Sequence, residues 1–240
     1  MPFTYDNGLV MLSVGAVIFG AFTALVMTAG IRFASEGIAK FRLVLAALTL
    51  GLGAWAMHFI GLLAVELPVR ISFDAAYIIA AAALAIILSM FAFFVSRAQS
   101  IGDWSLPLGA IVMGGGFAGM FYLGVASIRG GVEAQHSWFA VIITVAIAIQ
   151  AAVIALWLAF RRRGVFLTLA GTLGLGLTIS AMHYGAMESI SFAPSPSLAG
   201  VAIPEFSEIS LAWTAAVVLY LLCSLCLAVY ALFQFLSETK

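Results

Sequence analysis

The chain has 240 residues, of which 65% are hydrophobic and only 8% are charged. A soluble domain carries about 25% charged residues, so this composition excludes a soluble globular fold of this size. The formal net charge is zero, with ten basic and ten acidic residues, which argues against a nucleic-acid-binding protein and against a strongly acidic partner.

Apolar runs separated by clusters of charge, Pro and Gly predict seven transmembrane helices, since crossing a bilayer takes roughly 20 apolar residues. In chain order the predicted spans lie near residues 8–33, 43–65, 75–96, 106–128, 138–160, 165–188 and 209–236. The first run has no basic residue before Arg32 and is longer than the apolar region of a signal peptide. We therefore expect it to remain as a span.

The basic residues of the connections are distributed unequally between the two sides of this topology. Eight fall on one side and two on the other; the eight are Arg32, Lys40, Arg42, Arg97, Arg161, Arg162, Arg163 and Lys240, and the two are Arg70 and Arg129. Because basic residues concentrate on the cytoplasmic side, we expect the N-terminus outside and the C-terminus in the cytoplasm.

The sequence also contains an internal repeat. The second, fourth and sixth predicted spans carry the related segments GLGAWAMHFIGLLAVE, GGGFAGMFYLGVASIR and GLTISAMHYGAMES. Their alignment places Met57, Met120 and Met182 at equivalent positions, 63 and 62 residues apart. Each repeat contains two spans, so all three enter the membrane in the same direction. We expect them to be related by rotation about the membrane normal.

The predicted fold is therefore an all-α polytopic membrane protein in which residues 1–240 form a single transmembrane domain. Three two-helix repeats, at about 8–66, 75–129 and 138–188, are expected to form a pseudo-threefold bundle, with one extra helix at 209–236 packed outside. The second, fourth and sixth spans should surround the axis, because small residues permit close helix packing in lipid. The glycines behind this expectation are Gly51, Gly53, Gly114, Gly115, Gly116, Gly119, Gly171, Gly174 and Gly176.

Two histidines, His58 and His183, occupy equivalent positions in predicted membrane helices. Each lies shortly before an outer acidic residue, which places both in the outer half of the bilayer, and the repeat symmetry should bring them face to face. Ionisable residues inside a membrane are functional candidates, because an unpaired polar group there is costly. Each histidine follows a methionine, and Met187 lies one helical turn beyond His183. Imidazole with thioether is a ligand set that suits copper, particularly Cu(I).

The segments MHFIG at Met57, MFYLG at Met120 and MHYGAM at Met182 resemble the repeated motif of the bacterial MHYT family, and the resemblance covers essentially the whole chain. It implies a multi-pass module of the bacterial inner (plasma) membrane with a sensory role, often joined to cyclic-di-nucleotide or other signalling domains. It further implies that the motif binds copper and responds to oxygen, carbon monoxide or nitric oxide. Carried over residue by residue, the implied metal ligands are Met57, His58, Met120, Met182, His183 and Met187.

The chain departs from the family motif at several positions. Phe121 stands where the second histidine belongs, and Leu62 and Val125 replace the trailing methionines of the first two copies. The third copy reads Gly-Ala at Gly185 and Ala186, where the family usually has Thr-Gly or similar. We expect no output domain after the seventh span within this chain, so a signal would pass to a separate signalling protein or to a portion absent from this chain.

Three classes of function remain open on these residues. The first is a membrane sensor whose partners are the lipid bilayer and a diatomic gas. The second is an electron-transfer protein that holds haem between His58 and His183. The third is a carrier for a small solute or a metal ion. We do not expect an enzyme, since the sequence offers no activated nucleophile, no phosphate-binding loop and no paired membrane carboxylates.

For some further residues we expect a role in the structure only, and not in a functional site. We expect His136 to be a solvated loop residue, and Cys223 and Cys226 to be small packing residues. Glu66 and Arg129 lie at equivalent distances beyond the motif, which suggests an ion pair between them at the outer rim.

Overall fold

The structure is a computed structural model that describes residues 1–69, 71–97, 99–160, 164–195 and 208–238. Within these residues, seven helices are long and apolar enough to cross a membrane. They are α1 (Asn7–Thr28), α2 (Glu36–Leu63), α3 (Ala75–Arg97), α4 (Ser105–Ala126), α5 (Trp138–Phe160), α6 (Val165–Glu188) and α7 (Glu208–Glu238). Short 3-10 helices precede α2 and α4, namely η1 (Ile31–Phe33) and η2 (Gln99–Trp104). The predicted all-α fold with seven spans is confirmed, although α2 begins at Glu36 and not near residue 43.

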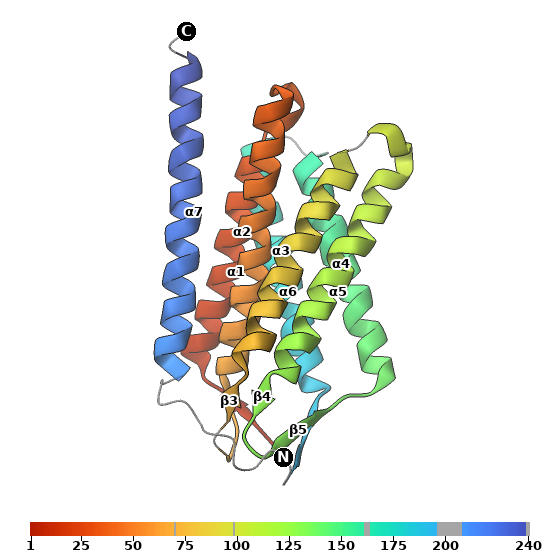
Figure 1. The fold of residues 1–240 in the computed structure, drawn as a ribbon, viewed down its shortest axis with the longest axis vertical. Helices are drawn as coiled ribbons and strands as arrows, with labels where there is room; N and C mark the ends of the chain where they lie inside the picture. Colours follow the sequence, from red (N-terminus) through yellow and green to blue (C-terminus); the bar gives the residue numbers. More distant parts are fainter. Residues whose placement is uncertain (70, 98, 161–163, 196–207, 239–240) are drawn as a thin grey trace.

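Three short antiparallel ribbons lie at one end of the bundle, where the N-terminus also lies (Figure 1). β1 (Thr4–Tyr5) pairs with β2 (Val65–Glu66), β3 (Ser72–Phe73) with β4 (Ile128–Arg129), and β5 (Val132–Gln135) with β6 (Ser191–Pro194). Each ribbon joins the strand before an odd-numbered helix to the strand after the next even-numbered helix. The two ends of each repeat therefore meet at this end of the molecule, which we call the ribbon end.

The six helices of the repeats form a closed ring of neighbours. Within the repeats α1 packs on α2, α3 on α4 and α5 on α6; between the repeats α2 packs on α3, α4 on α5 and α6 on α1. α2 also contacts α4 and α6 across the interior, whereas α7 packs on α1 and α2 (Figure 1). The arrangement confirms three repeats in a pseudo-threefold bundle with one extra helix outside.

The inner helices are not enclosed equally. In their most apolar segments, 72% of α2 and 61% of α4 are buried, but only 39% of α6, which is no more than for α5. α6 thus lies at the axis, as expected, but it is less enclosed than α2 and α4. The reason is that the extra helix packs on the first repeat, so one face of α6 with Leu173 and Leu177 stays exposed.

Glycines at equivalent positions set the contacts between repeats. A Cβ added to Gly51 would lie 2.8 Å from the Cα of Ile86, one at Gly114 would lie 2.5 Å from the Cα of Ile149, and one at Gly176 would lie 2.5 Å from Cγ1 of Ile18. These isoleucines belong to the first helix of the following repeat, each at the same distance from the helix start. Small residues thus permit close helix approach, as predicted.

Two glycines of the predicted inner helices do not contribute to this packing. Gly115 and Gly174 are exposed, and a Cβ at either would meet no heavy atom within 4 Å. Their neighbours in the sequence take the packing positions because a helix turns 100° per residue.

The first helix of each repeat, α1, α3 or α5, begins with an equivalent capping residue. Asp6 Oδ1 accepts from Leu9 N at 2.9 Å, Asp74 Oδ1 from Ala76 N at 2.9 Å, and Ser137 Oγ from Ala140 N at 3.2 Å. Such caps satisfy amide groups that the first turn leaves unpaired and contribute about 1 kcal/mol each. They also fix the residue just before each cap, which is Tyr5, Phe73 or His136.

The described basic residues follow the predicted asymmetry. Arg129 lies at the ribbon end, whereas Arg32, Lys40, Arg42 and Arg97 lie at the opposite end. Arg70, Arg161, Arg162, Arg163 and Lys240, which entered the same prediction, lie outside the described residues.

Candidate functional site

Three aromatic rings from the three repeats meet inside the bundle. His58 of α2, Phe121 of α4 and His183 of α6 occupy equivalent positions, one residue after each motif methionine. The ring centroids are 5.2 Å apart for His58 and Phe121, 5.6 Å for Phe121 and His183, and 5.0 Å for the two histidines. None is more than 1% exposed. We call these three residues the ring triangle.

The two imidazoles are hydrogen-bonded to each other. The Nδ1 atoms of His58 and His183 lie 2.9 Å apart, and which ring donates depends on the tautomer. The predicted approach of the two histidines is therefore confirmed. When both rings are neutral, the accepting ring must carry its own proton on Nε2.

The outer nitrogens of this pair are left without partners. Neither His58 Nε2 nor His183 Nε2 has a hydrogen bond in the part of the chain that the structure describes. A buried polar group without a partner costs about 1–3 kcal/mol. A packing role does not explain this cost, so the pair is a functional candidate.

Glycines of neighbouring repeats make room for the two imidazoles. A Cβ at Gly124 would overlap His58 Nε2, and a Cβ at Gly61 would overlap His183 Nε2. Both glycines lie four residues after their motif methionine, so the histidine of one repeat points at the glycine of the next. In the third repeat Ala186 takes the glycine position, and the pseudo-symmetry pairs it with Phe121. The glycines four residues after the first two motif methionines are visible in the sequence, but without the structure they are not linked to the histidines.

The predicted thioether ligands fall into two groups. Met57, Met120 and Met182 are no more than 1% exposed and belong to one buried cluster. Met187 is also buried, but it belongs to a second cluster nearer the ribbon end, together with Leu62 and Val125. The structure therefore brings the three motif methionines into one cluster and places Met187 apart from them.

The donor set fits a soft ion better than a hard one. Among the described residues, no group of three or more His, Cys, Asp or Glu is arranged to hold a metal. Metal binding here would rest on the two imidazoles with nearby thioethers, a set that favours Cu(I) over magnesium or calcium. Two nitrogens that share one metal at about 2.0–2.1 Å lie roughly 3.3–4.2 Å apart. The observed 2.9 Å fits after a small separation of the rings.

A further set of aromatic contacts links the motifs to the strands at the ribbon end. The residue after each ring-triangle position packs on a residue of the following repeat's first strand or its end. The pairs are Phe59 with Phe73 at 5.9 Å, Tyr122 with His136 at 5.3 Å, and Tyr184 with Tyr5 at 5.4 Å. The threefold relation thus extends from the bundle interior to the ribbon end.

Tyr184 is a site residue that the sequence reasoning missed. Its ring lies 4.7 Å from that of His183, and its hydroxyl lies 2.6 Å from Ser13 Oγ. The hydroxyl of Tyr5, which packs on Tyr184, has no hydrogen-bond partner in the described chain. Burial, and after it the Glu188 carboxylate, raises the pKa of Tyr5.

The ion pair suggested between Glu66 and Arg129 is wrong. Arg129 Nη2 pairs with Asp74 Oδ2 at 3.1 Å, and Glu66 Oε2 accepts from the Thr4 hydroxyl at 2.8 Å. The cause is the ribbon pairing, which sets Arg129 and Glu66 in different ribbons.

The structure also shows the surroundings of the residues that were expected to have a loop or packing role. His136 is exposed, as expected, but it also packs on Tyr122. Cys223 and Cys226 are buried free thiols.

The comparisons with known proteins agree with the repeat. The sequence profile of the family MHYT, described as a bacterial signalling protein N terminal repeat, matches residues 51–108 and 114–172. The chain is 33% identical over 206 residues to the bifunctional diguanylate cyclase/cyclic di-GMP phosphodiesterase MucR of Pseudomonas aeruginosa. It is 26% identical over 196 residues to the signaling protein YkoW of Bacillus subtilis, and 29% identical over 195 residues to the cyclic di-GMP phosphodiesterase NbdA of Pseudomonas aeruginosa.

These alignments cover most of this chain but a minor part of the relatives. They include 83%, 79% and 78% of this chain, but 30%, 24% and 24% of MucR, YkoW and NbdA. No solved structure matches. From the motif, the repeat and these matches together, the chain belongs to the MHYT family of bacterial membrane signalling proteins.

Proposed function

We propose that this chain is a sensor module in which His58 and His183 bind a single copper ion, so that oxygen, carbon monoxide, nitric oxide or a change of redox state alters helix packing. The observation that carries the proposal is the buried bond of 2.9 Å between two imidazoles from equivalent places of two repeats. The membership in a family of signalling proteins supports the sensory role. Met57, Met120, Met182 and Met187 are the proposed thioether donors.

The surroundings of the pair determine how binding would be transmitted. Bound Cu(I) supplies an electron that an oxidant can remove and a position at which a diatomic gas can bind. The two rings must separate to share an ion, and their Nε2 ends already abut Gly124 and Gly61. A movement of His58 is therefore passed to α4, and a movement of His183 is passed to α2. Interiors packed this closely do not absorb such shifts locally.

α2 connects the ring triangle to the last helix. Phe59, Ile60 and Leu63 of α2 share a buried cluster with Ala212, Ala215, Ala216, Leu219 and Cys223 of α7. A shift of α2 near His58 would thus change the packing of α7. We propose that α7 passes the signal to a cyclic-di-nucleotide signalling domain or a separate signalling protein. The relatives support this route, since most of their length lies outside the aligned region and two are named for cyclic di-GMP chemistry.

The same packing favours an ion over haem. Two axial nitrogens would stand on opposite faces of the macrocycle, whereas the Nδ1 atoms of His58 and His183 are in direct contact and Phe121 packs on both rings. The proposed setting is the bacterial inner (plasma) membrane, with the ribbon end outside and the C-terminus in the cytoplasm. We propose no catalytic role for the transmembrane bundle itself.

Elemental analysis of the protein purified in detergent after loading with Cu(I) tests the proposal. We expect about one copper per chain in the parent protein and a loss of that copper in the double variant His58→Ala/His183→Ala. His136→Ala is the matched control, because it removes the third histidine, which is exposed and outside the bundle, and should leave the copper content unchanged. Equal copper in the parent and the double variant would eliminate the site.

A further inference from the structure

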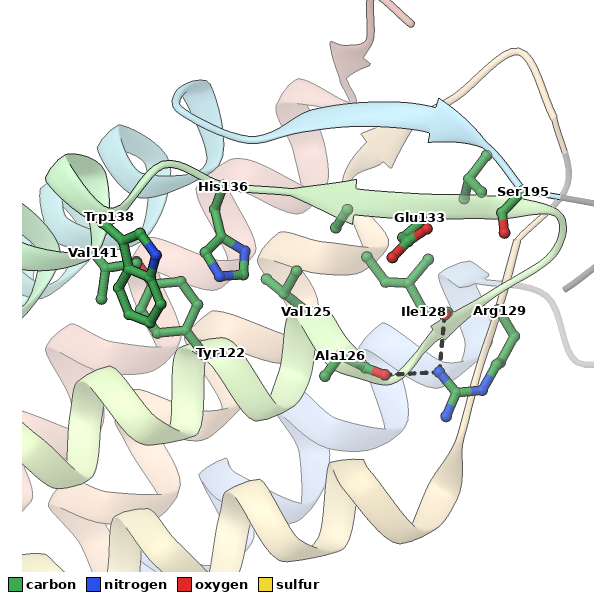
Figure 2. A pocket seen from close by; sticks show the side chains of 12 residues that line it. Tyr122, Val125, Ala126, Ile128, Arg129, Glu133, His136, Trp138, Val141 and Ser195 are labelled. Carbon is green, nitrogen blue, oxygen red and sulfur yellow. Dashed lines mark hydrogen bonds between the residues drawn. The ribbon is translucent and has the colours of Figure 1, made fainter. Parts of the chain in front are cut away.

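A cavity at the ribbon end is separate from the ring triangle. It has a volume of about 550 Å³ and lies between α4, α5 and the ribbon of β5 and β6 (Figure 2). None of the histidines or methionines of the proposed copper site lines it. Its volume lies within the range of about 300–1,000 Å³ that is common for small-ligand sites.

One end of the cavity is aromatic. Tyr122, His136 and Trp138 line it together, and Figure 2 shows the three side chains grouped at the same end. The rings of Tyr122 and His136 lie 5.3 Å apart with an angle of 46° between their planes. Trp138, the first residue of α5, is 82% exposed at the cavity wall. Aromatic faces of this kind attract cations, and Trp does so most strongly.

The other end of the cavity carries an excess of negative charge. Arg129 is already neutralised by Asp74, and its Nη1 donates to the carbonyls of Ala126 and Ile128 at 2.7 and 3.0 Å. Glu133 also lines the cavity, and no ion pair is found for it among the residues that the structure describes. Apart from His136, the cavity therefore carries one uncompensated carboxylate.

The cavity exists because the junction between the second and third repeats departs from the other two junctions. At the equivalent places, Phe73 packs on Phe59 and Tyr5 packs on Tyr184, and both covering rings are half-buried. Over Tyr122 the covering residue is His136, which is smaller and exposed. The ribbon above it is also longer, with four residues in each strand where the other ribbons have two. At the other two junctions an aromatic ring fills this space, whereas beside Tyr122 the space stays open and forms the cavity.

We propose that this cavity binds an organic cation of the alkylammonium class. The ammonium group lies against Tyr122, His136 and Trp138 and is balanced by the Glu133 carboxylate, while Val125, Val132 and Val141 contact its apolar substituents. Anions are disfavoured by Glu133, and a metal ion would find one carboxylate and one imidazole only. The cation is either a free amine or the ammonium headgroup of a membrane phospholipid, since both present the same chemistry.

The cavity lies close to the ring triangle, so a bound cation would contact a residue that packs on it. Tyr122 packs edge-on against Phe121 with 5.0 Å between ring centroids and an angle of 89°. Phe121 in turn contacts both histidines. The occupant of the cavity is therefore one side chain away from the ring triangle, although its binding does not require copper.

Calorimetric titration of the full chain in nanodiscs of phosphatidylglycerol, which has no amine headgroup, tests the proposal. Choline and butylammonium are titrated, with acetate as the anionic comparison. We expect saturable binding of the two cations and none of acetate. Glu133→Gln and Trp138→Ala should each weaken cation binding about tenfold. The matched controls are Glu66→Gln, another exposed ribbon-end carboxylate, and Trp104→Ala, an exposed tryptophan at the opposite end; both should bind like the parent.

A second arm distinguishes the two sources of the cation. Nanodiscs that contain phosphatidylethanolamine should weaken choline binding if the lipid headgroup occupies the cavity, and should leave it unchanged if the ligand is a free amine. The absence of cation binding in the parent, or equal binding by the parent and Glu133→Gln, would overturn the proposal. Copper content is measured in every variant; because none of the substituted residues belongs to the ring triangle, a failure of the cation site leaves the copper proposal untouched, and the reverse also holds.

Discussion

The imidazoles of His58 and His183 are held in place by the absence of side chains in the neighbouring repeat. Each Nε2 lies too close to Gly124 or Gly61 for that glycine to carry a Cβ, so the orientation of the rings depends on these two glycines. The packing around the two histidines therefore depends on residues of all three repeats.

We predict that Gly124→Ala displaces His58, breaks its bond to His183 and destabilises the protein by about 1–3 kcal/mol, because overpacking forces buried groups to move. The control is Gly115→Ala in the same helix, where the added methyl group meets no atom within 4 Å. Thermal unfolding in detergent and copper content are measured for both variants. An equal effect of the two substitutions would contradict the role assigned to Gly124.

A second prediction concerns the residue that interrupts the histidine pattern. Phe121→His places a third imidazole in the ring triangle, and the cross-repeat relation implies that this imidazole needs a glycine at position 186. We therefore expect the double variant Phe121→His/Ala186→Gly to retain copper against a competing chelator better than the parent, and better than Phe121→His alone. If the double variant performs no better than the single one, the cross-repeat relation does not hold for the third repeat.

At the scale of the elements, Asp74 has two roles that can be separated. Its Oδ1 caps α3 through Ala76 N, and its Oδ2 pairs with Arg129 across the second ribbon. Asp74→Asn keeps a capping oxygen and loses only a partly exposed ion pair, which contributes about 0–1 kcal/mol. Asp74→Ala also loses the cap, worth about 1 kcal/mol more. We expect chemical unfolding to rank the parent above Asp74→Asn, and Asp74→Ala lowest; equal losses would show that the cap contributes nothing.

Helices and strands differed in how far the sequence could predict them. The seven spans followed from the length of the apolar runs, because each helix satisfies its own backbone in lipid. The three ribbons were not predicted. Alternation over two residues gives no recognisable period, and each ribbon joins strands about 60 residues apart in sequence. The prediction of an ion pair between Glu66 and Arg129 was wrong because the ribbons were not predicted. Side-chain neighbours at the ribbon end depend on strand pairing and register.

On the scale of the whole molecule, the period of the repeat carried the most information. Two histidines at matching points of repeats that share one membrane direction had to approach a common axis, and they do. The period of the repeat does not predict in which direction the imidazole rings of His58 and His183 point. That direction depends on glycines of other helices, on Phe121, and on how closely the backbones approach, all of which are tertiary effects.

The proposed orientation of the bundle leads to a fourth prediction. With the ribbon end outside, a cysteine introduced at Gln135 should react in intact cells with a maleimide that cannot cross the membrane. One introduced at Gly37, which is exposed at the opposite end, should react only after the membrane is permeabilised. The native Cys223 and Cys226 are buried and give a low background. Labelling of the Gly37 variant alone in intact cells would reverse the assigned orientation.

The attachment of α7 to α1 and α2 makes the three copies of the repeat unequal in what they can tolerate. The first copy packs against both sister copies and against α7, so its surface makes more contacts within the chain than that of the other copies. The second copy packs on its sister copies and carries a benzyl group at the histidine position, and the cavity lies where it meets the third copy, beneath the longest ribbon. Because α7 packs on the first copy, the proposed cation site lies at a junction of repeats on which the terminal helix does not pack.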